Sequence, residues 1–144
     1  MKDIAGSAPL HLSRAAWEAI RAHAERVAPD ECCGLLIGDA ARIDAAWPAG
    51  NQSSTPRLRY ELDPRDHFAA IRAARARGLA VVGAYHSHPR STPQPSASDR
   101  EEASPHFTYL IVGRPGSPSS EPWQARAFAS RDGNFVERSL VFEA

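Results

Sequence analysis

Hydrophobic residues recur every three or four positions in some segments, as in helices, and every second position in others, as in strands. Segments of the two kinds follow one another in mixed order along the chain. A first helix is predicted after Ser13, because serine caps helices well and apolar residues then recur three or four positions apart. These residues, which we expect to face a core, are Trp17, Ile20, Ala24 and Val27. The helix should end before Pro29, since a residue that precedes proline is biased away from helical geometry.

A second helix is predicted to begin at the Asp63-Pro64 pair. Aspartate is a good N-cap, and proline is tolerated at the first helical position. Phe68 and Ile71 are expected to form the inward-facing apolar side of this helix. Gly78 then provides a C-terminal stop, because glycine readily adopts the left-handed conformation that ends helices.

Shorter apolar runs, several of them alternating with polar residues, predict strands. They lie at residues 10–12, 31–37, 42–47, 57–62, 79–88, 107–112, 123–130 and 135–142. The first is short and is expected at a sheet edge, and a turn at 132–134 joins the last two. A short helix at 97–103 is predicted from the capping-box spacing of Ser98 and Glu101.

The order of these elements favours one layered α/β domain of the α+β type that spans residues 1–144. Strands and helices are mixed without the strict alternation of a doubly wound sheet, so a mixed β-sheet flanked by helices is expected. The chain is 42% hydrophobic and 24% charged, which is typical of globular proteins and excludes extensive disorder.

Charge and hydropathy exclude several classes of partner. Lysine and arginine number 17, as do aspartate and glutamate, so the formal net charge is zero. A neutral chain is a poor candidate for binding nucleic acid or an anionic membrane. The longest apolar stretch, 78–85, is far shorter than the ~20 residues of a membrane span, and residues 1–9 lack a signal peptide's apolar run. A cytoplasmic location is therefore expected.

The chain has two cysteines, Cys32 and Cys33, which are adjacent in a predicted buried strand. Successive side chains on a strand point to opposite faces, so the two thiols are not expected to ligate one metal ion together. Small buried cysteines that pack in the interior are the favoured interpretation.

The strongest chemical signal is the sequence His86-Ser87-His88-Pro89 followed by Asp99. Residues two apart on a strand share a face, so the two imidazoles can point at one site, and a proline-rich excursion can return Asp99 to it. Two histidines and a carboxylate that leave a position for water are typical of a catalytic zinc site. The residues alone also allow a simpler interpretation, with surface histidines and an aspartate that complements a helix dipole.

The pattern His86-x-His88, seven residues, Ser96, two residues and Asp99 resembles the JAMM (JAB1/MPN+) zinc metalloprotease motif. Glu31 fills the motif's upstream acidic position, beside the apolar run 32–38. The resemblance covers most of the chain, to about Val112, and fits the small stand-alone prokaryotic type. It implies the MPN/JAB fold, a layered fold like that of cytidine deaminase.

The resemblance also implies a role for each matched residue. His86, His88 and Asp99 would hold one Zn²⁺ with a bound water. Glu31 would act as general acid and base, and Ser96 would stabilise the oxyanion of the tetrahedral intermediate. Without the family resemblance, Glu31 is interpreted as a solvated charge, and Ser96 can be a simple helix cap.

The family implies a peptidase or isopeptidase that hydrolyses the amide bond after the C-terminal Gly-Gly tail of a ubiquitin-like protein. The loop 48–56 is short, as expected for a minimal domain that acts on a ubiquitin-like sulfur carrier. Two alternatives remain, a non-catalytic MPN scaffold and a peptidase for phage-tail or cell-wall peptides. The sequence leaves open the carrier, the adduct, the oligomeric state and the role of the loop Arg114–Pro122.

Overall fold

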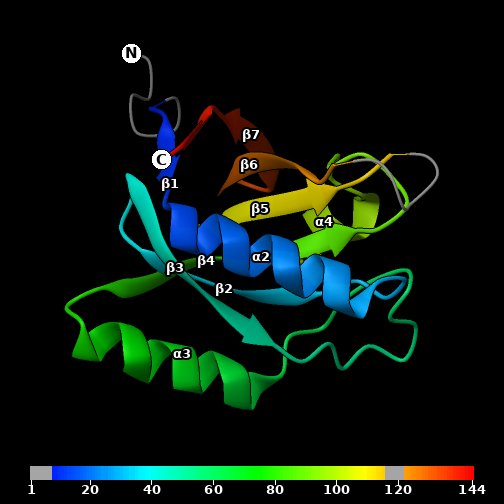
Figure 1. Cartoon of the computed structure of the whole chain (residues 1–144), viewed down its shortest axis with the longest axis horizontal. Coiled ribbons are helices and arrows are strands. Elements are labelled where there is room, and N and C mark those ends of the chain that lie inside the picture. The colour runs from blue at the N-terminus through cyan, green and yellow to red at the C-terminus, as the bar shows by residue number, and fades with distance from the viewer. Residues whose placement is uncertain (1–7, 116–121) are drawn as a thin grey trace.

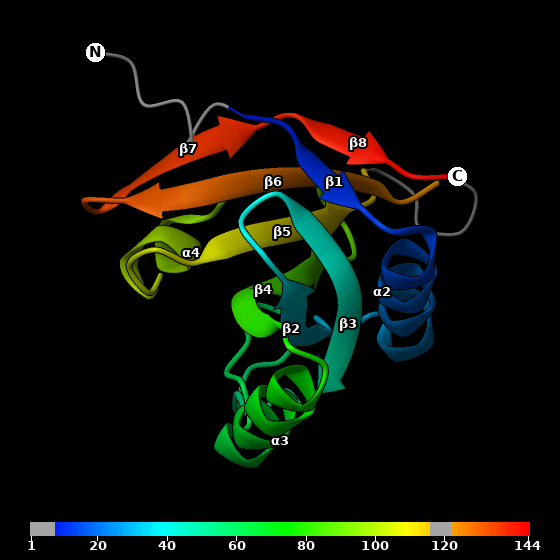
Figure 2. The same ribbon diagram turned by 90° about the vertical axis from the view of Figure 1, so that its left-hand side faces the viewer.

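A computed structural model describes residues 8–115 and 122–144 of the chain. A single eight-stranded sheet runs through this part, with helices on both of its faces (Figures 1 and 2). In chain order the elements are β1 (Leu10–Leu12), α2 (Arg14–Val27), β2 (Cys33–Gly38), β3 (Arg42–Ala49), α3 (Pro64–Ala76), β4 (Ala80–His88), α4 (Ala97–Glu101), β5 (Thr108–Gly113), β6 (Gln124–Arg131), β7 (Asn134–Arg138) and β8 (Leu140–Phe142). The predicted mixed sheet with flanking helices is confirmed.

The strand order is β7-β6-β5-β4-β2-β3-β1-β8. β4 is parallel to β5 and antiparallel to β2, so it lies inside the sheet and its C-terminal end is held on both sides. β1 is parallel to both β3 and β8. The prediction that β1 is an edge strand is therefore wrong, because β8 from the C-terminus pairs outside it.

One face of the sheet is covered by α2, whose buried residues pack against β-strand side chains to form the main core (Figure 1). Ser13 caps this helix as predicted: its hydroxyl oxygen accepts from the Ala16 N–H at 3.0 Å and its O–H donates to the Asp44 carbonyl at 2.7 Å. Trp17 packs against the core, and its ring contacts the Phe142 ring edge-on, with the two ring centroids 5.2 Å apart. The cap therefore also joins the helix to β3.

The opposite face is covered by α3. Asp63 caps this helix, because its Oδ1 accepts from the Arg65 N–H at 2.9 Å. The helix ends before Gly78, whose φ is +71°. The prediction that Phe68 faces inward is wrong, since 63% of its surface is exposed. Ala70 and Ala74 are the buried residues of this helix. Small alanines let the helix approach the sheet closely, and Phe68 lies roughly 200° around the helix from Ala70.

Residues 57–62, predicted as a strand, instead form a loop with one isolated bridge between Asn51 and Leu62. Alternation of polar and apolar residues was the only signal for a strand here, and no neighbouring strand is available to pair with it. The predicted strand 135–142 divides into β7 and β8, because the chain leaves β6 to reach β1. The β6–β7 turn has positive φ at Asp132 and Gly133, as a two-residue hairpin turn requires.

None of the helices in the described ranges is long and apolar enough to cross a membrane.

Candidate active site

The two predicted histidine ligands lie at the C-terminal end of β4, on the face that α3 covers. His86 is 1% exposed and His88 is 8% exposed. As the i, i+2 spacing predicts, both rings point the same way, and their Nε2 atoms are 3.2 Å apart. The flanking strands β2 and β5 pair with this end of β4, so the backbone that carries both rings is held firmly.

Asp99 approaches the two rings from α4. Its Oδ1 lies 3.1 Å from His86 Nε2 and its Oδ2 lies 3.2 Å from His88 Nε2. A capping box orients it: the Asp99 N–H donates to Ser96 Oγ, and the Ser96 N–H donates to Asp99 Oδ2. The box was predicted at Ser98 and Glu101 and forms two residues earlier, at Ser96 and Asp99, so that the Asp99 carboxylate belongs both to the cap and to the site.

These three residues fit a divalent cation. Their nearest ligand atoms all lie within 4.8 Å of one another. His88 Nδ1 donates to the Thr92 carbonyl oxygen at 3.0 Å, so the neutral form of this ring would present the lone pair of Nε2 to the cluster. Converging imidazole lone pairs and a carboxylate are the donors that zinc and similar ions prefer.

The surroundings of His86 and Asp99 favour the protonation states that a metal ion needs, whereas burial of His88 is outweighed by its hydrogen bonds with Asp99 and Thr92, which raise its pKa. Burial lowers the pKa of His86, which favours the neutral imidazole. Burial alone would raise the pKa of Asp99, but hydrogen bonds with His86 and His88 outweigh it and hold that pKa well below its usual range. A neutral imidazole and an ionised carboxylate are the ligand forms of these residues.

Glu31 lies just before β2 and is only 7% exposed. Its Oε1 is buried and has no hydrogen-bond partner among the described residues. Burial raises the pKa of this carboxyl to about 7, a shift that the charge of Asp99 reinforces and that of His88 opposes. A carboxyl that titrates near neutrality can both accept and donate a proton at physiological pH.

Ser96 is exposed, three residues before Asp99. Its hydroxyl oxygen accepts from the Asp99 N–H at 3.0 Å and lies 3.2 Å from the Ser98 hydroxyl. The structure thus shows the capping role that the sequence allowed. It also brings Ser96 next to a predicted metal ligand.

The two cysteines lie on opposite faces of the sheet and are both buried, as predicted. Cys32 belongs to the core under α2, while Cys33 pairs with His86 across β2 and β4 and directs its thiol toward the Gly50 carbonyl at 3.4 Å. Burial raises the pKa of Cys32 to about 11 and that of Cys33 to about 12. Both thiols are therefore protonated and unreactive at neutral pH.

Sequence reasoning missed two residues that contact the site, Asn51 and Tyr60. The Asn51 side-chain amide donates to the Glu31 carbonyl at 3.1 Å. The Tyr60 ring stacks on the His86 ring, with centroids 4.4 Å apart and planes 22° apart. A signal for Asn51 exists, because the sequence Asn-x-Ser fits an Asx turn, which the Ser53 N–H forms with Asn51 Oδ1. No local pattern marks Tyr60.

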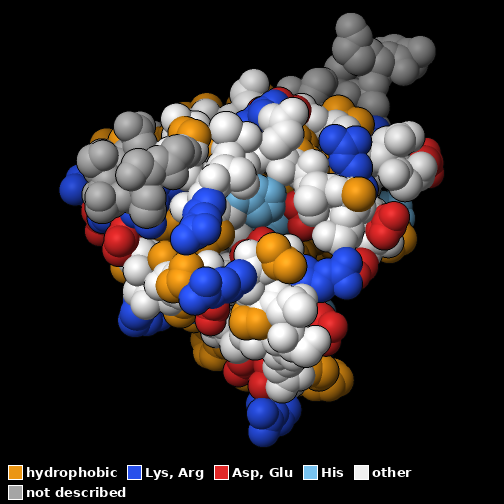
Figure 3. Space-filling model, turned by 90° about the vertical axis from the view of Figure 1, so that its right-hand side faces the viewer, with side chains coloured by type: hydrophobic (Ala, Val, Ile, Leu, Met, Phe, Trp, Pro, Cys, Tyr) orange, Lys and Arg blue, Asp and Glu red, His pale blue; other side chains and the backbone are white. Residues whose placement is uncertain are grey.

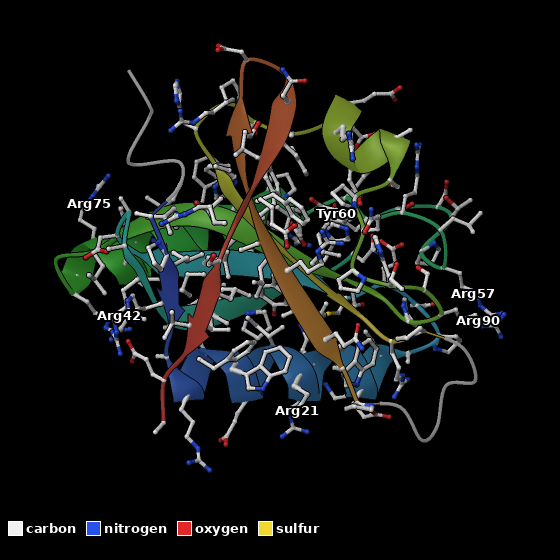
Figure 4. The ribbon with its side chains drawn as sticks, turned by 90° about the horizontal axis from the view of Figure 1, so that it is seen from above. Arg21, Arg42, Arg57, Tyr60, Arg75 and Arg90 are labelled. Carbon is white, nitrogen blue, oxygen red and sulfur yellow. The ribbon has the colours of Figure 1, made fainter. Side chains whose placement is uncertain are left out.

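A cleft of about 350 Å³ opens beside Glu31 and His88. Its other lining residues are Pro29, Arg57, Leu58, Pro89, Arg90 and Ser91. Figure 3 shows a histidine at the bottom of a hollow, with cationic side chains around it. Arg57 and Arg90 both extend outward on one side of the molecule (Figure 4). The nearest ion pair of Arg57, to Asp30 at 3.9 Å, joins exposed groups and is weak.

Residues 13–128 match the family described as prokaryotic homologs of the JAB domain. The chain is 41% identical over 129 residues to the desampylase of Haloferax volcanii, covering 85% of this chain and 93% of that protein. It is 35% identical over 107 residues to the "Probable TtuB-protein conjugate cleaving protease" of Thermus thermophilus, and the match covers 74% of this chain and 72% of that protein. It is 34% identical over 97 residues to the CysO-cysteine peptidase of Mycobacterium bovis, covering 65% and 66%.

Solved structures agree with the fold. The solution structure of a protein from Desulfitobacterium hafniense has a TM-score of 0.80 at 27% identity, and the match covers 93% of this chain and 92% of that one. The crystal structure of a JAB1/MPN domain protein from Archaeoglobus fulgidus has a TM-score of 0.52 at 23% identity, covering 92% and 96%. The latter likeness concerns the fold alone.

Proposed function

Since this chain belongs to the prokaryotic homologs of the JAB domain, we propose that it is a zinc-dependent isopeptidase. Its substrate would be a ubiquitin-like sulfur carrier, and the bond cleaved would be the amide that follows the carrier's C-terminal Gly-Gly tail. The names of three relatives support this choice: a desampylase, a protease that cleaves TtuB conjugates, and a CysO-cysteine peptidase.

One observation carries the proposal: Glu31, a buried acid with a pKa near 7, borders the same cleft as His88, which belongs to the converging His86-His88-Asp99 set. His86, His88 and Asp99 would hold the metal ion. When bound, a zinc ion would polarise the scissile carbonyl and make a water molecule acidic enough to attack at neutral pH. This donor set with an adjacent acid has no use in a scaffold that only assembles proteins.

Glu31 moves the proton in this proposal. Its carboxylate takes a proton from the attacking water and delivers it to the nitrogen of the departing amine. A pKa of about 7 suits both steps, because neither protonation state is strongly favoured at neutral pH. The unpartnered Oε1 is the atom that is free to accept the proton.

Ser96 would assist at the oxyanion. Its oxygen accepts from the Asp99 N–H and lies 3.2 Å from the Ser98 hydroxyl, and either serine can be the donor in that contact, so the Ser96 proton is not committed to one partner. That proton can turn toward negative charge as the carbonyl becomes tetrahedral, and donors of this kind contribute a factor of ~10²–10³ in kcat.

A Gly-Gly tail suits a cleft whose wall includes a metal ligand, because the tail must pass close to that ligand. Glycine lacks a Cβ, so its backbone can approach a narrow site more closely than any other residue. We propose that residues 1–144 act as one domain in the cytoplasm and that the tail lies along the cleft that Glu31 and His88 border.

The test is mass spectrometry of a ubiquitin-like carrier whose Gly-Gly terminus is joined to cysteine or to a lysine side chain. The zinc-loaded protein should release the carrier ending in Gly-Gly, and a chelator should stop the reaction. Glu31→Gln should keep the zinc and lose turnover by ~10²–10⁴-fold, because it removes the proton carrier and leaves the ligands intact.

A carrier that ends in Ala-Ala serves as the matched substrate. It should bind more weakly and be cleaved more slowly than the Gly-Gly carrier. Equal affinity for both tails, or an active Glu31→Gln variant, would contradict the proposal.

A further inference from the structure

The segment 51–62, between β3 and α3, is a closed loop although it has no regular secondary structure. Its ends meet at the bridge between Asn51 and Leu62, and the Gln52 N–H donates to the Glu61 carbonyl at 2.9 Å. Both ends therefore have a defined position relative to the end of β3. A loop held in this way can place its side chains as reproducibly as a strand.

Asn51 uses its whole side-chain amide within this loop. Nδ2 donates to the carbonyls of Glu31 and Arg59, both at 3.1 Å. Oδ1 accepts from the N–H groups of Ser53 and Glu61, both at 3.0 Å. An asparagine amide can form four such bonds, so this side chain is saturated and rigidly held.

The backbone of Glu31 is bound on both sides by the same loop. Its N–H donates to the Pro56 carbonyl at 2.8 Å, and its C=O accepts from Asn51. Glu31 precedes β2, which begins at Cys33, so it lies outside the hydrogen-bonded ladder of the sheet. The loop thus holds the Glu31 backbone directly, while the next residue, Cys32, is bonded to Ser87 of β4.

Tyr60 lies next to the Asn51-bound residues Arg59 and Glu61. Figure 4 shows Tyr60 directed into the molecule, whereas Arg57 of the same loop extends outward. Its ring stacks on His86 at 4.4 Å. His86 Nδ1 is buried and has no hydrogen-bond partner in the described ranges, so that no polar contact through Nδ1 orients this ring. His88, by contrast, is oriented by Thr92.

We propose that Asn51 and Tyr60 are positioning residues of the active site, through which one loop sets the Glu31 backbone and the His86 ring relative to each other. The inference concerning Glu31 rests on the proposed function, since it takes Glu31 as the general base. Displacing a catalytic group by about 1 Å can cost ~10²-fold in rate, so such a device matters for turnover.

The Tyr60 arm of the experiment measures metal binding without activity. Zinc affinity is measured by calorimetry, and the absorption spectrum of bound Co²⁺ reports the ligand geometry. Tyr60→Phe keeps the stacked ring and should match the wild type, whereas Tyr60→Leu keeps apolar bulk, loses the stack and should lower affinity by ~10–100-fold. Equal zinc affinities for the wild type and both variants would overturn this role of the ring. So would an equal loss of zinc affinity in Tyr60→Phe and Tyr60→Leu.

The Asn51 arm separates kcat from KM. Asn51→Asp preserves size and one acceptor but places an oxygen against the Glu31 and Arg59 carbonyls. At saturating zinc it should lower kcat by at least ~10-fold with KM within about twofold, because it displaces the Glu31 backbone and Asn51 itself contacts no metal ligand. Asn51→Ala should behave similarly. An unchanged kcat, or a loss of kcat that follows a loss of zinc, would overturn this role.

Gln52→Ala is the matched control, since Gln52 is exposed in the same loop and, among residues 8–115 and 122–144, is bonded only through its backbone. It should match the wild type in every measurement. Thermal unfolding of each variant checks that the fold persists. If the wild type binds zinc but cleaves no carrier, the proposed function fails. The zinc affinities of the Tyr60 variants would still show whether Tyr60 positions His86, because they are measured without the reaction.

Discussion

Glu31 and Asp99 both carry buried carboxyl groups, yet their neighbours shift their pKa values in opposite directions. Asp99 receives hydrogen bonds from two histidines, which stabilise its charge. Glu31 Oε1 receives none, so burial dominates and favours the protonated form. One carboxyl is thus suited to hold a cation and the other to carry a proton, a division of roles that residue type alone does not show.

The raised pKa of Glu31 predicts a pH-dependent stability of the metal-free protein. Between the ordinary value of 4.5 and about 7, the folded state keeps a proton that the unfolded state has lost. The free energy of unfolding therefore falls as pH rises through this window, by on the order of 3 kcal/mol. Urea denaturation of chelator-treated wild type and Glu31→Gln between pH 4.5 and 8 measures the effect.

The difference between the two proteins isolates Glu31, because His88 and Asp99 titrate in both. The stability of the wild type relative to Glu31→Gln should decrease up to about pH 7 and then stay level. A difference that does not change with pH would show that Glu31 is not buried in this way.

A second residue-scale prediction separates ligands from bystanders on the same face. Asp99→Ala should lower zinc affinity and activity together, by more than the ~10–100-fold that loss of an outer-sphere partner costs. Cys33→Ser should spare both, because the thiol faces the Gly50 carbonyl and lies outside the converging set. Calorimetry with zinc measures each affinity. A Cys33→Ser variant that lost zinc would mean that the thiol is a ligand.

Among the elements, the starts of the two long helices were predicted well, whereas residues 57–62 of the 51–62 loop were wrongly predicted as a strand. Ser13 and Asp63 cap their helices as expected, because capping depends on residues only two or three positions away. The loop resembled a strand because alternation is a local pattern. Whether a strand forms depends on a partner strand, which the pattern does not contain.

The close contact between β5 and the proline-rich return from β4 leads to an element-scale prediction. A Cβ at Gly113 would lie within 2.6 Å of backbone atoms of Ser91, Thr92 and Pro93. Gly113→Ala should therefore push this segment away from β5, cost ~1–3 kcal/mol of stability and weaken zinc binding, since Thr92 orients His88.

Gly50→Ala is the control for Gly113→Ala, because a Cβ at Gly50 meets only the Asp66 carboxylate at 3.7 Å, an ordinary contact. Its stability and zinc affinity should stay close to those of the wild type, as followed by thermal unfolding and calorimetry. Equal behaviour of the two variants would mean that the return segment adjusts without effect on the site.

Across the whole molecule, one sheet joins the two ends of the chain. β1 and β8 pair in parallel, and the core under α2 includes residues from Leu10 to Ala127. Such continuity predicts a single cooperative unfolding transition. Circular dichroism and tryptophan fluorescence should give the same midpoint, because the tryptophans lie in α2 (Trp17), in β3 (Trp47) and just before β6 (Trp123).

Zinc should raise that midpoint, because an ion that binds only the folded state stabilises it. At a free zinc concentration of 100 times the Kd, the gain is ~2.7 kcal/mol. The Asp99→Ala variant, which lacks one ligand, should show little of this gain when measured by the same denaturation. Two separate transitions, or a zinc effect that persists in Asp99→Ala, would contradict the single domain or the ligand set.

The sequence by itself determined the helix caps, the buried central strand, the shared face of His86 and His88 and the family likeness that pointed to Glu31, because these depend on short spacings along the backbone. Only the tertiary structure decided that Glu31 is buried beside that site, that Phe68 is exposed and that Tyr60 covers His86. Those features arise from contacts between residues such as Glu31 and Asn51, 20 positions apart, and burial is a property of the assembled chain rather than of any segment.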